Sequence, residues 1–290
     1  EVIAQLADQA LEQAGLSRGD IDAVAVTYAP GLIGAVLVGV SFAKSVAYAL
    51  GVPLIPVHHV RGHIAANYLA HPDLEPPFVC LCVSGGTSLL VDVKGYTEME
   101  ILGATRDDAA GECFDKIARV MGLGYPGGAP LDRAAQGGND KAFSLPRVHI
   151  QDAPLDMSFS GLKTAMLNLI HNAQQKGEEL PVADLAASFS AAVSEELVPR
   201  TMAAAQAKGY GKVAVVGGVA ANSRIRRDLE QACQAAGCTL YLPPLKLCGD
   251  NGSMIGSQGY YEYLAGTRAG TDLNAYANRE ISRPYGTGTA

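Results

Sequence analysis

Short apolar runs alternate along this chain with longer helix-compatible segments. The apolar runs predict strands at 23–27, 53–57, 78–83, 88–93, 212–216 and 239–242. The longer segments predict helices at 1–16, 34–50, 109–121, 161–175, 184–208 and 223–236. Ser84–Thr87, with its two glycines, predicts a hairpin turn between two of the strands. A hairpin combined with strand–helix units indicates an α/β fold with mixed sheets flanked by helices.

Composition supports a compact α/β protein. The chain has 290 residues, of which 48% are hydrophobic and 18% charged. No stretch reaches the ~20 uninterrupted apolar residues of a membrane helix, and the amphipathic start does not resemble a signal peptide. The six cysteines form no CxxC pair, so we expect reduced thiols and a cytoplasmic location without membrane contact. The polar tail after Ala269 is expected to be loosely ordered.

The charge of the whole chain does not favour nucleic-acid binding. Its formal net charge is −7, whereas phosphate binding requires a basic surface. Two local groups of basic residues are exceptions: Arg224, Arg226 and Arg227, and Lys116, Arg119 and Arg133. Short charged groups are usually solvated helix faces. A polyanionic partner would therefore meet a local patch or be held partly by another protein.

His59 and His63 are separated by four positions in a segment that we expect to be helical. This spacing places two imidazoles on one helix face, close enough to bind one metal ion. The metalloprotease motif also requires a glutamate directly after the first histidine, and this chain has Val60 there. The spacing is thus compatible with a metal site but disfavours peptide hydrolysis. The alternative is that the histidines only cap or pack the helix.

Asp250 precedes an apolar segment expected to form a helix. An aspartate in that position is most often an N-cap. Together with His59 and His63, it would instead complete a set of two histidines and one carboxylate with open coordination positions. Such a set suits iron or zinc.

Three glycine-rich turns are candidates for phosphate binding: Ser84–Thr87, Gly122–Pro130 and Gly217–Asn222. Glycines let backbone amides approach a phosphate closely, and a helix N-terminus favours negative charge. Asp115 and Asp132 flank the second turn and are candidate acceptors for ribose hydroxyls. Helix capping is the alternative interpretation, above all for Asp132.

Taken together, these segments resemble the tRNA threonylcarbamoyladenosine transferase family of TsaD-type proteins, a branch of the actin, Hsp70 and sugar-kinase superfamily. The resemblance covers nearly the whole chain. It rests on Ala29–Gly34, His58, His59, His63, Val83–Gly86, Asp107–Lys116, Tyr125–Gly128, Ser158–Thr164, Gly217–Asn222 and Asp250–Asn251.

The resemblance implies a two-lobed, ribonuclease H-like α/β fold. We expect one lobe from residues 1–75 and 251–290 and a second from residues 76–250, with Ser160 and Lys163 in a contact between lobes or in a structural role. It also implies transfer of a threonylcarbamoyl group from threonylcarbamoyl-AMP to the adenosine 3′ of the anticodon, in tRNAs that read ANN codons.

By similarity, His59, His63 and Asp250 would hold one divalent metal ion, Fe²⁺ or Zn²⁺. The adenylate pocket would be lined by Cys82, Val83, Ser84, Gly85, Gly86, Asp115, Gly128, Asp132 and Asn222. ATP, ADP or AMP would be able to occupy the same pocket. No Ser or Cys nucleophile is required, because the adenine amine is itself the attacking group.

The implied partners are tRNA, a TsaB-like paralogue and a small TsaE-like ATPase, with a homodimer as a further expectation and a separate synthase supplying the adenylate. Three positions depart from the family pattern. Thr87-Ser88 replaces His-Thr, and Arg61 stands where many relatives have Glu. The chain also begins with a helix where the family has a β-hairpin with an Asp-x-Ser-type phosphate loop. We therefore expect an incomplete first lobe, an exposed strand edge and reduced solubility or activity of this chain alone.

Three other classes of protein remain as alternatives. A zinc hydrolase or peptidase would require a carboxylate base beside the metal. A regulatory nucleotide-binding module would bind adenylate without any group transfer. A sugar kinase has no reason to need the two histidines.

Overall fold

The computed structural model describes residues 2–147, 150–283 and 285–286. The chain divides into two compact units. Unit 1 comprises Glu1–Leu69, Gly95–Met99 and Asn251–Ala290, and unit 2 comprises Ala70–Lys94 and Glu100–Asp250. The short segment Gly95–Met99 belongs to unit 1 although unit 2 surrounds it in the sequence, which the expected boundaries at 75 and 250 do not anticipate.

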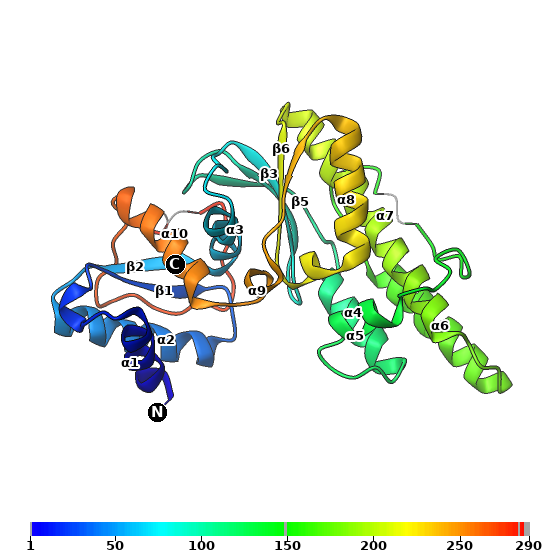
Figure 1. The fold of residues 1–290 in the computed structure, drawn as a ribbon, viewed down its shortest axis with the longest axis horizontal. Coiled ribbons are helices and arrows are strands. Elements are labelled where there is room, and N and C mark those ends of the chain that lie inside the picture. The colour runs from blue at the N-terminus through cyan, green and yellow to red at the C-terminus, as the bar shows by residue number, and fades with distance from the viewer. Residues whose placement is uncertain (1, 148–149, 284, 287–290) are drawn as a thin grey trace. The chain divides into compact units, whose positions relative to one another are not determined.

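Unit 1 is built on a parallel pair of strands, β1 (Val24–Ala29) and β2 (Leu54–His58). Its helices are α1 (Val2–Ala14), α2 (Ile33–Leu50), α3 (His59–Ala70) and α10 (Gly252–Leu264), with a short 3₁₀ turn at Arg18–Asp20. Helix α2 lies on one face of the strand pair and α10 on the other (Figure 1). Gly259 permits this close packing of α10, because a Cβ there would lie 2.5 Å from Cβ of Ala25.

Helix α2 is apolar on both faces. By length and composition it is the one helix among the described residues that would be compatible with a membrane span. However, Val40, Ala43 and Ala47 are buried, and Lys44 donates hydrogen bonds to the carbonyls of Thr271 and Leu273. The helix is therefore the covering layer of the β1–β2 pair, with an apolar outer face.

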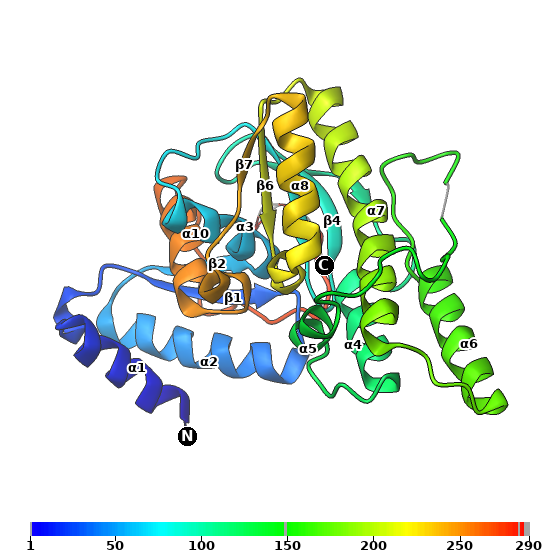
Figure 2. The same cartoon turned by 45° about the vertical axis from the view of Figure 1, so that its right-hand side comes forward.

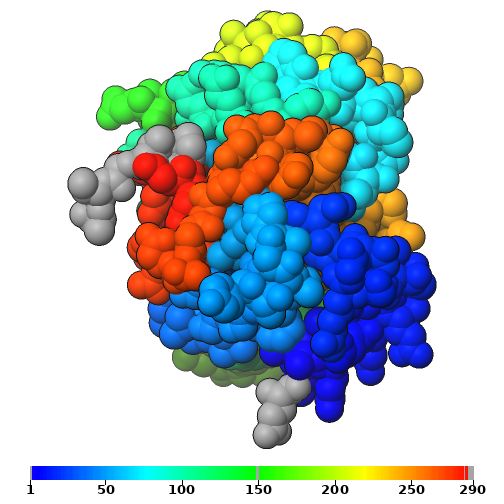
Figure 3. Space-filling view, turned by 90° about the vertical axis from the view of Figure 1, so that its left-hand side faces the viewer, coloured from blue at the N-terminus to red at the C-terminus, as the bar shows by residue number. Residues whose placement is uncertain are grey.

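The segment after α10 is packed, in contrast to the loosely ordered tail that its polar composition suggests. Leu273, Ala275 and Ile281 are buried. The amide of Tyr276 donates to the carbonyl of Tyr28 in β1. Figure 3 shows the orange and red C-terminal part of the chain lying against the blue part of the same unit. We call residues 269–283 the C-terminal strap. These buried apolar residues and backbone hydrogen bonds anchor it, and so few apolar positions leave no clear sequence signal.

Unit 2 contains a five-stranded mixed sheet in the order β5-β4-β3-β6-β7. The strands are β3 (Phe78–Val83), β4 (Ser88–Val93), β5 (Met99–Ala104), β6 (Lys212–Val216) and β7 (Thr239–Tyr241). Strand β3 pairs antiparallel with β4 and parallel with β6, which pairs parallel with β7. The helices are α4 (Ala110–Val120), α5 (Gly128–Ala134), α6 (Ser160–Lys176), α7 (Val182–Lys208), α8 (Ser223–Ala236) and α9 (Leu245–Cys248), with a 3₁₀ turn at Gly218–Ala221. Helices α7 and α8 lie side by side against the sheet (Figure 2).

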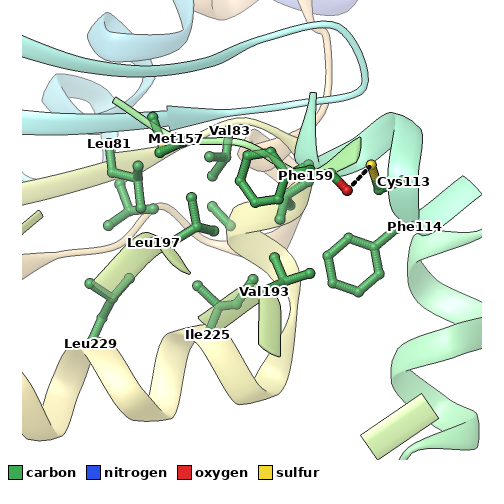
Figure 4. Close-up of a cluster of buried hydrophobic side chains, with 14 of the residues drawn as sticks. Leu81, Val83, Cys113, Phe114, Met157, Phe159, Val193, Leu197, Ile225 and Leu229 are labelled. Carbon is green, nitrogen blue, oxygen red and sulfur yellow. Dashed lines mark hydrogen bonds between the residues drawn. The ribbon is translucent and has the colours of Figure 1, made fainter. Parts of the chain in front are cut away.

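The core of unit 2 joins the sheet to α4, α7 and α8. Figure 4 shows Leu81 and Val83 of β3 facing apolar residues of these helices, with Cys113 and Phe114 on α4. The thiol of Cys113 donates to the carbonyl of Phe159 at 3.8 Å. Burial, with a further contribution from Asp108, raises the pKa of Cys113 to about 12. This thiol therefore stays protonated at neutral pH and packs as an apolar side chain.

The sequence predicts most of these elements with correct type and bounds. The structure confirms the mixed α/β fold with sheets flanked by helices. Strand β5 and helices α5 and α9 are absent from the prediction. Strand β5 lacks a continuous apolar run, because it contains Glu100 and Gly103, and α5 begins with Gly128 and contains Pro130.

Candidate metal and ligand site

Strand β2 runs directly into α3, and His58 is the residue that caps this helix. Its Nδ1 accepts a hydrogen bond from the amide of Val60 at 3.3 Å, and its Nε2 lies 3.0 Å from the carbonyl of Arg279. Burial lowers the pKa of His58 to about 4. A neutral ring with the proton on Nε2 satisfies both contacts. The capping alternative concerned His59 and His63, and the histidine that makes this capping bond is His58.

His59 and His63 lie one turn apart on α3, with ring centroids 4.7 Å from each other. One ligand atom from each of these rings and one from Asp250 all lie within 4.8 Å of one another. His63 is buried, His59 is half-buried and Asp250 is exposed. Metal ions bind such atoms at about 2.0–2.2 Å, so small side-chain rotations would bring all three atoms to one ion. The donor set and its spacing fit a divalent metal ion.

Asp250 is not the cap of α10. The side-chain oxygen of Asn251 accepts a hydrogen bond from the amide of Met254 at 2.9 Å and supplies the N-cap. Asp250 immediately precedes this cap. Helix α10 packs closely on α3, because a Cβ at Gly62 would lie 2.6 Å from Cδ1 of Ile255. The junction between Asp250 and α10 thereby brings the carboxylate to the two histidines.

The turn after β3 and the start of α4 are held together by backbone contacts in unit 2. The amide of Ser84 donates to the carbonyl of Thr87, and the amide of Gly111 donates to the carbonyl of Ser84. A Cβ at Gly111 would lie 2.4 Å from that carbonyl oxygen, so only glycine fits. The hydroxyl of Ser88 accepts from the amide of Ala110 at 3.0 Å. Ser88, at one of the departures from the family pattern, therefore caps α4.

The turn after β6 lies at the same edge of the sheet, because β3 and β6 are parallel neighbours. Gly217 has a φ of +93°, and a Cβ there would lie 2.2 Å from the carbonyl oxygen of Val83. Asn222 ends this turn. Its side-chain oxygen accepts from the amide of Ile225 at 3.1 Å, whereas its buried Nδ2 has no hydrogen-bond partner among the described residues. A buried amide donor of this kind is suited to a ligand.

Asp115 and Asp132 both make structural hydrogen bonds. Asp115 Oδ1 accepts from the amide of Gly127 at 2.6 Å, which closes the second glycine turn onto α4. Asp132 Oδ1 accepts from the amide and hydroxyl of Ser223, the first residue of α8. Asp132 itself lies inside α5, and the N-cap residue of α8 is Asn222, so Asp132 is the N-cap residue of neither helix. Among the described residues, these bonds leave Oδ2 of each carboxylate for a ligand.

The remaining pocket candidates differ in what they expose. The side chains of Cys82 and Val83 are buried in β3, so only their backbone could meet a ligand. Gly85 and Gly86 are exposed, and Gly128 is half-buried at the start of α5. The 3₁₀ turn at Gly218–Ala221 contacts α4, α5 and β3. The three glycine turns are thus collected in one region of unit 2.

Asp107 anchors α6 to the loop before α4, a role that the sequence interpretation does not assign. Its carboxylate accepts hydrogen bonds from the hydroxyls of Ser158 and Ser160 and from the amides of Phe159 and Ser160. Asp108 pairs with Lys163. Burial alone would raise the pKa of Asp107, but these hydrogen bonds lower it below the usual value. Ser160 and Lys163 therefore have a structural role within unit 2. In the sequence, the two adjacent aspartates just before a predicted helix were the signal that could have indicated this contact.

The two groups of basic residues are largely engaged within unit 2. Arg224 forms ion pairs with Asp140 and Asp228. The other contacts are Arg226 with the carbonyls of Ala220 and Pro243, Arg227 with Asp228, Lys116 with Glu112, and Arg119 with the ring of Tyr125. These contacts support a solvated and structural role for most of these cations.

Two curated relatives of this chain carry the same name. A curated tRNA N6-adenosine threonylcarbamoyltransferase of Clostridium botulinum (strain 657 / Type Ba4) is 50% identical over 281 residues, which is 97% of this chain and 83% of that protein. A relative with the same name from Moorella thermoacetica is 53% identical over 275 residues, covering 95% of this chain and 80% of that protein.

Solved structures with a similar fold include HypF of T. kodakarensis. Its TM-score is 0.66 at 19% identity, over 89% of this chain and 42% of that chain. Component A of the (R)-2-hydroxyglutaryl-CoA dehydratase of Acidaminococcus fermentans has a TM-score of 0.50 at 17% identity, over 90% of this chain and 84% of that chain. These neighbours support the two-lobed actin-like fold class and nothing further. The family model described as TsaD, tRNA N6-adenosine threonylcarbamoyltransferase, matches residues 1–257, and the chain belongs to that family.

Proposed function

We propose that this chain is a tRNA N6-adenosine threonylcarbamoyltransferase. It transfers the threonylcarbamoyl group of threonylcarbamoyl-AMP to the N6 amine of the adenosine 3′ of the anticodon, in tRNAs that read ANN codons. The observation that carries this proposal is the grouping of His59, His63 and Asp250 in a chain about half identical to curated transferases of that name.

The reaction needs no protein nucleophile. The N6 nitrogen attacks the carbamoyl carbon, a C–N bond forms and the nitrogen loses a proton. The bond from that carbon to the phosphate oxygen breaks, and its electron pair leaves with AMP. The high pKa of Cys113, about 12, removes the cysteine next to the glycine turns as a competing nucleophile.

We propose that His59, His63 and Asp250 bind one Fe²⁺ or Zn²⁺ ion. When bound, the ion supplies a Lewis acid for the carbamoyl carbonyl and the departing phosphate. Helix α3 holds the two imidazoles one turn apart, and α10 brings Asp250 to them. Val60 leaves this group without the adjacent general base of a metalloprotease, which favours group transfer over peptide hydrolysis.

The adenylate is proposed to bind at the glycine turns of unit 2. Support comes from the exposed Gly85 and Gly86, whose backbone amides suit a phosphate. The buried Nδ2 of Asn222 is a suitable donor to the base or sugar. Oδ2 of Asp115 and of Asp132 would accept hydrogen bonds from ribose hydroxyls, while Oδ1 of each keeps its structural bond.

A partner protein is part of the proposal. The outer face of α2 exposes Leu37, Val38 and Tyr48, a surface suited to an apolar partner such as the TsaB-like paralogue. The net charge of −7 and the engaged arginines of α8 favour a tRNA surface shared with that paralogue or with the TsaE-like ATPase.

Mass spectrometry of nucleosides tests this proposal. The chain is incubated with an unmodified ANN-decoding tRNA, threonylcarbamoyl-AMP and the partner proteins, and the tRNA is then digested. We expect threonylcarbamoyladenosine from the wild type and from His71→Ala, whose imidazole contacts the carbonyl of Leu242 and is not among the metal-ligand candidates. We expect none from His59→Ala. Equal product from His59→Ala would contradict the role of the metal, and no product from any variant would contradict the activity.

A further inference from the structure

Two side chains that flank His59 are tied to the same stretch of the C-terminal strap. His58 Nε2 lies 3.0 Å from the carbonyl of Arg279. Arg61 donates to the carbonyl of Ile281 twice, from Nε at 3.0 Å and from Nη2 at 2.7 Å. The first turn of α3 is therefore attached to a segment more than 200 positions away in the sequence, within the same unit.

Arg61 also forms a buried ion pair with α10. Its Nη1 lies 3.0 Å from Oε1 of Glu262, and the exposed fractions of the two residues are 3% and 5%. Glu262 is fully engaged, because Gln258 Nε2 donates to Oε1 and the hydroxyl of Thr267 donates to Oε2. The guanidinium fork thus joins α3, α10 and the strap at one buried point.

This buried point is attached to both helices next to which the metal-ligand candidates lie in the sequence. Arg61 stands two positions after His59 and two before His63 on the same helix. Glu262 is on α10, the helix whose N-terminus follows Asp250. The arginine therefore restrains both helices that bring the three ligand atoms together.

We infer that Arg61 is a positioning residue for the metal group, acting through Glu262 and the carbonyl of Ile281. This inference rests on the metal site of the proposed function. Outer partners of metal ligands typically contribute 10–100-fold to metal affinity.

The experiment measures Zn²⁺ affinity of the full chain by competition with a chromophoric chelator. Arg61→Met removes the ion pair and both hydrogen bonds to Ile281, whereas Arg61→Lys keeps the charge but loses the planar fork. Val40→Ala is the matched control, because Val40 is fully buried in the α2 core of the same unit and is not part of the network. The visible spectrum of bound Co²⁺ reports ligand geometry in each variant.

We expect Arg61→Met to weaken Zn²⁺ binding by about 10-fold or more and to alter the Co²⁺ spectrum, with Arg61→Lys intermediate. Val40→Ala should lower the thermal midpoint and leave both metal readouts unchanged. If Arg61→Met does not fold, the Arg61→Lys result decides. Wild-type affinity and spectrum in a folded Arg61 variant, or an equal loss in Val40→Ala, would overturn the inference while leaving the metal site intact. Failure of the wild type to bind Zn²⁺ or Co²⁺ would overturn both.

Discussion

The two histidines of unit 1, His59 and His63, and the glycine turns of unit 2 are positioned in different ways. In unit 1, side chains on α3 are restrained by ion pairs and hydrogen bonds to α10 and to the C-terminal strap. In unit 2, the glycine turns are held by close backbone packing. The backbone of Gly111 packs against that of Ser84, and the backbone of Gly217 packs against that of Val83. The first arrangement depends on ion pairs and hydrogen bonds between residues far apart in the sequence. Conservative substitutions of these residues should therefore weaken it gradually. The packing of the glycine turns depends on the absence of a side chain. A single added methyl group at Gly111 or Gly217 should therefore disrupt it.

The largest expected effect is the loss of a ligand on α3. Loss of a residue that supports a metal ligand typically costs about 10–100-fold in activity. Because His59 is itself a proposed ligand, His59→Ala should reduce transfer by more than that. Steady-state product formation by nucleoside mass spectrometry measures it. Because His59 is half-buried, we expect the thermal midpoint without metal to change little. Equal losses in metal-free stability and activity would indicate a packing role instead.

The second effect tests the glycine turns. Gly217→Ala forces a side chain into a φ of +93° and against the carbonyl of Val83, so we expect a cost of about 1–3 kcal/mol in the free energy of unfolding. Gly218→Ala is the matched control, since a Cβ there meets nothing within 4 Å. Urea unfolding of both variants measures the difference. Similar free energies of unfolding would mean that the turn after β6 is not held by this contact.

A smaller effect concerns the anchor of α6. The pKa of Asp107 is lowered in the folded state, so its stabilisation is present above the usual value of 3.8 and is lost as the pH falls below it. Asp107→Asn should therefore be less stable than the wild type at pH 7, and the difference should shrink below about pH 4. Thermal midpoints from pH 7 to pH 3 test this. A difference independent of pH would show that the ionised carboxylate is not what stabilises the contact.

The smallest expected effect is a difference in the alkylation rates of two cysteine thiols. Cys113, buried and with a pKa of about 12, should resist iodoacetamide at pH 8, whereas the half-buried Cys238 should react first. Peptide mass spectrometry after timed labelling measures the order. Early alkylation of Cys113 would show that the core around α4 opens readily.

Several features of the candidate site could be predicted from the sequence because their signals are local. The four-residue spacing of His59 and His63 gives their shared helix face, and the continuous apolar run of β3 gives its buried position. The glycine turns are equally local. In contrast, the sequence favoured Asp250 as the N-cap of α10, and its neighbour Asn251 belongs to a residue type that caps helices equally well. Only the coordinates show that Asn251 makes the bond.

By itself, the sequence determined the α/β alternation, the family and the candidate ligands, because these depend on periodicity and on ordered local motifs. Only the tertiary structure decided that His58 caps α3, that Asp132 accepts hydrogen bonds from Ser223 at the start of α8 and that residues 269–283 form a packed strap. It also decided that Arg61 pairs with Glu262. Each of these depends on which distant groups meet when the chain is folded, and a buried charge or carbonyl can be satisfied by many different partners along a sequence.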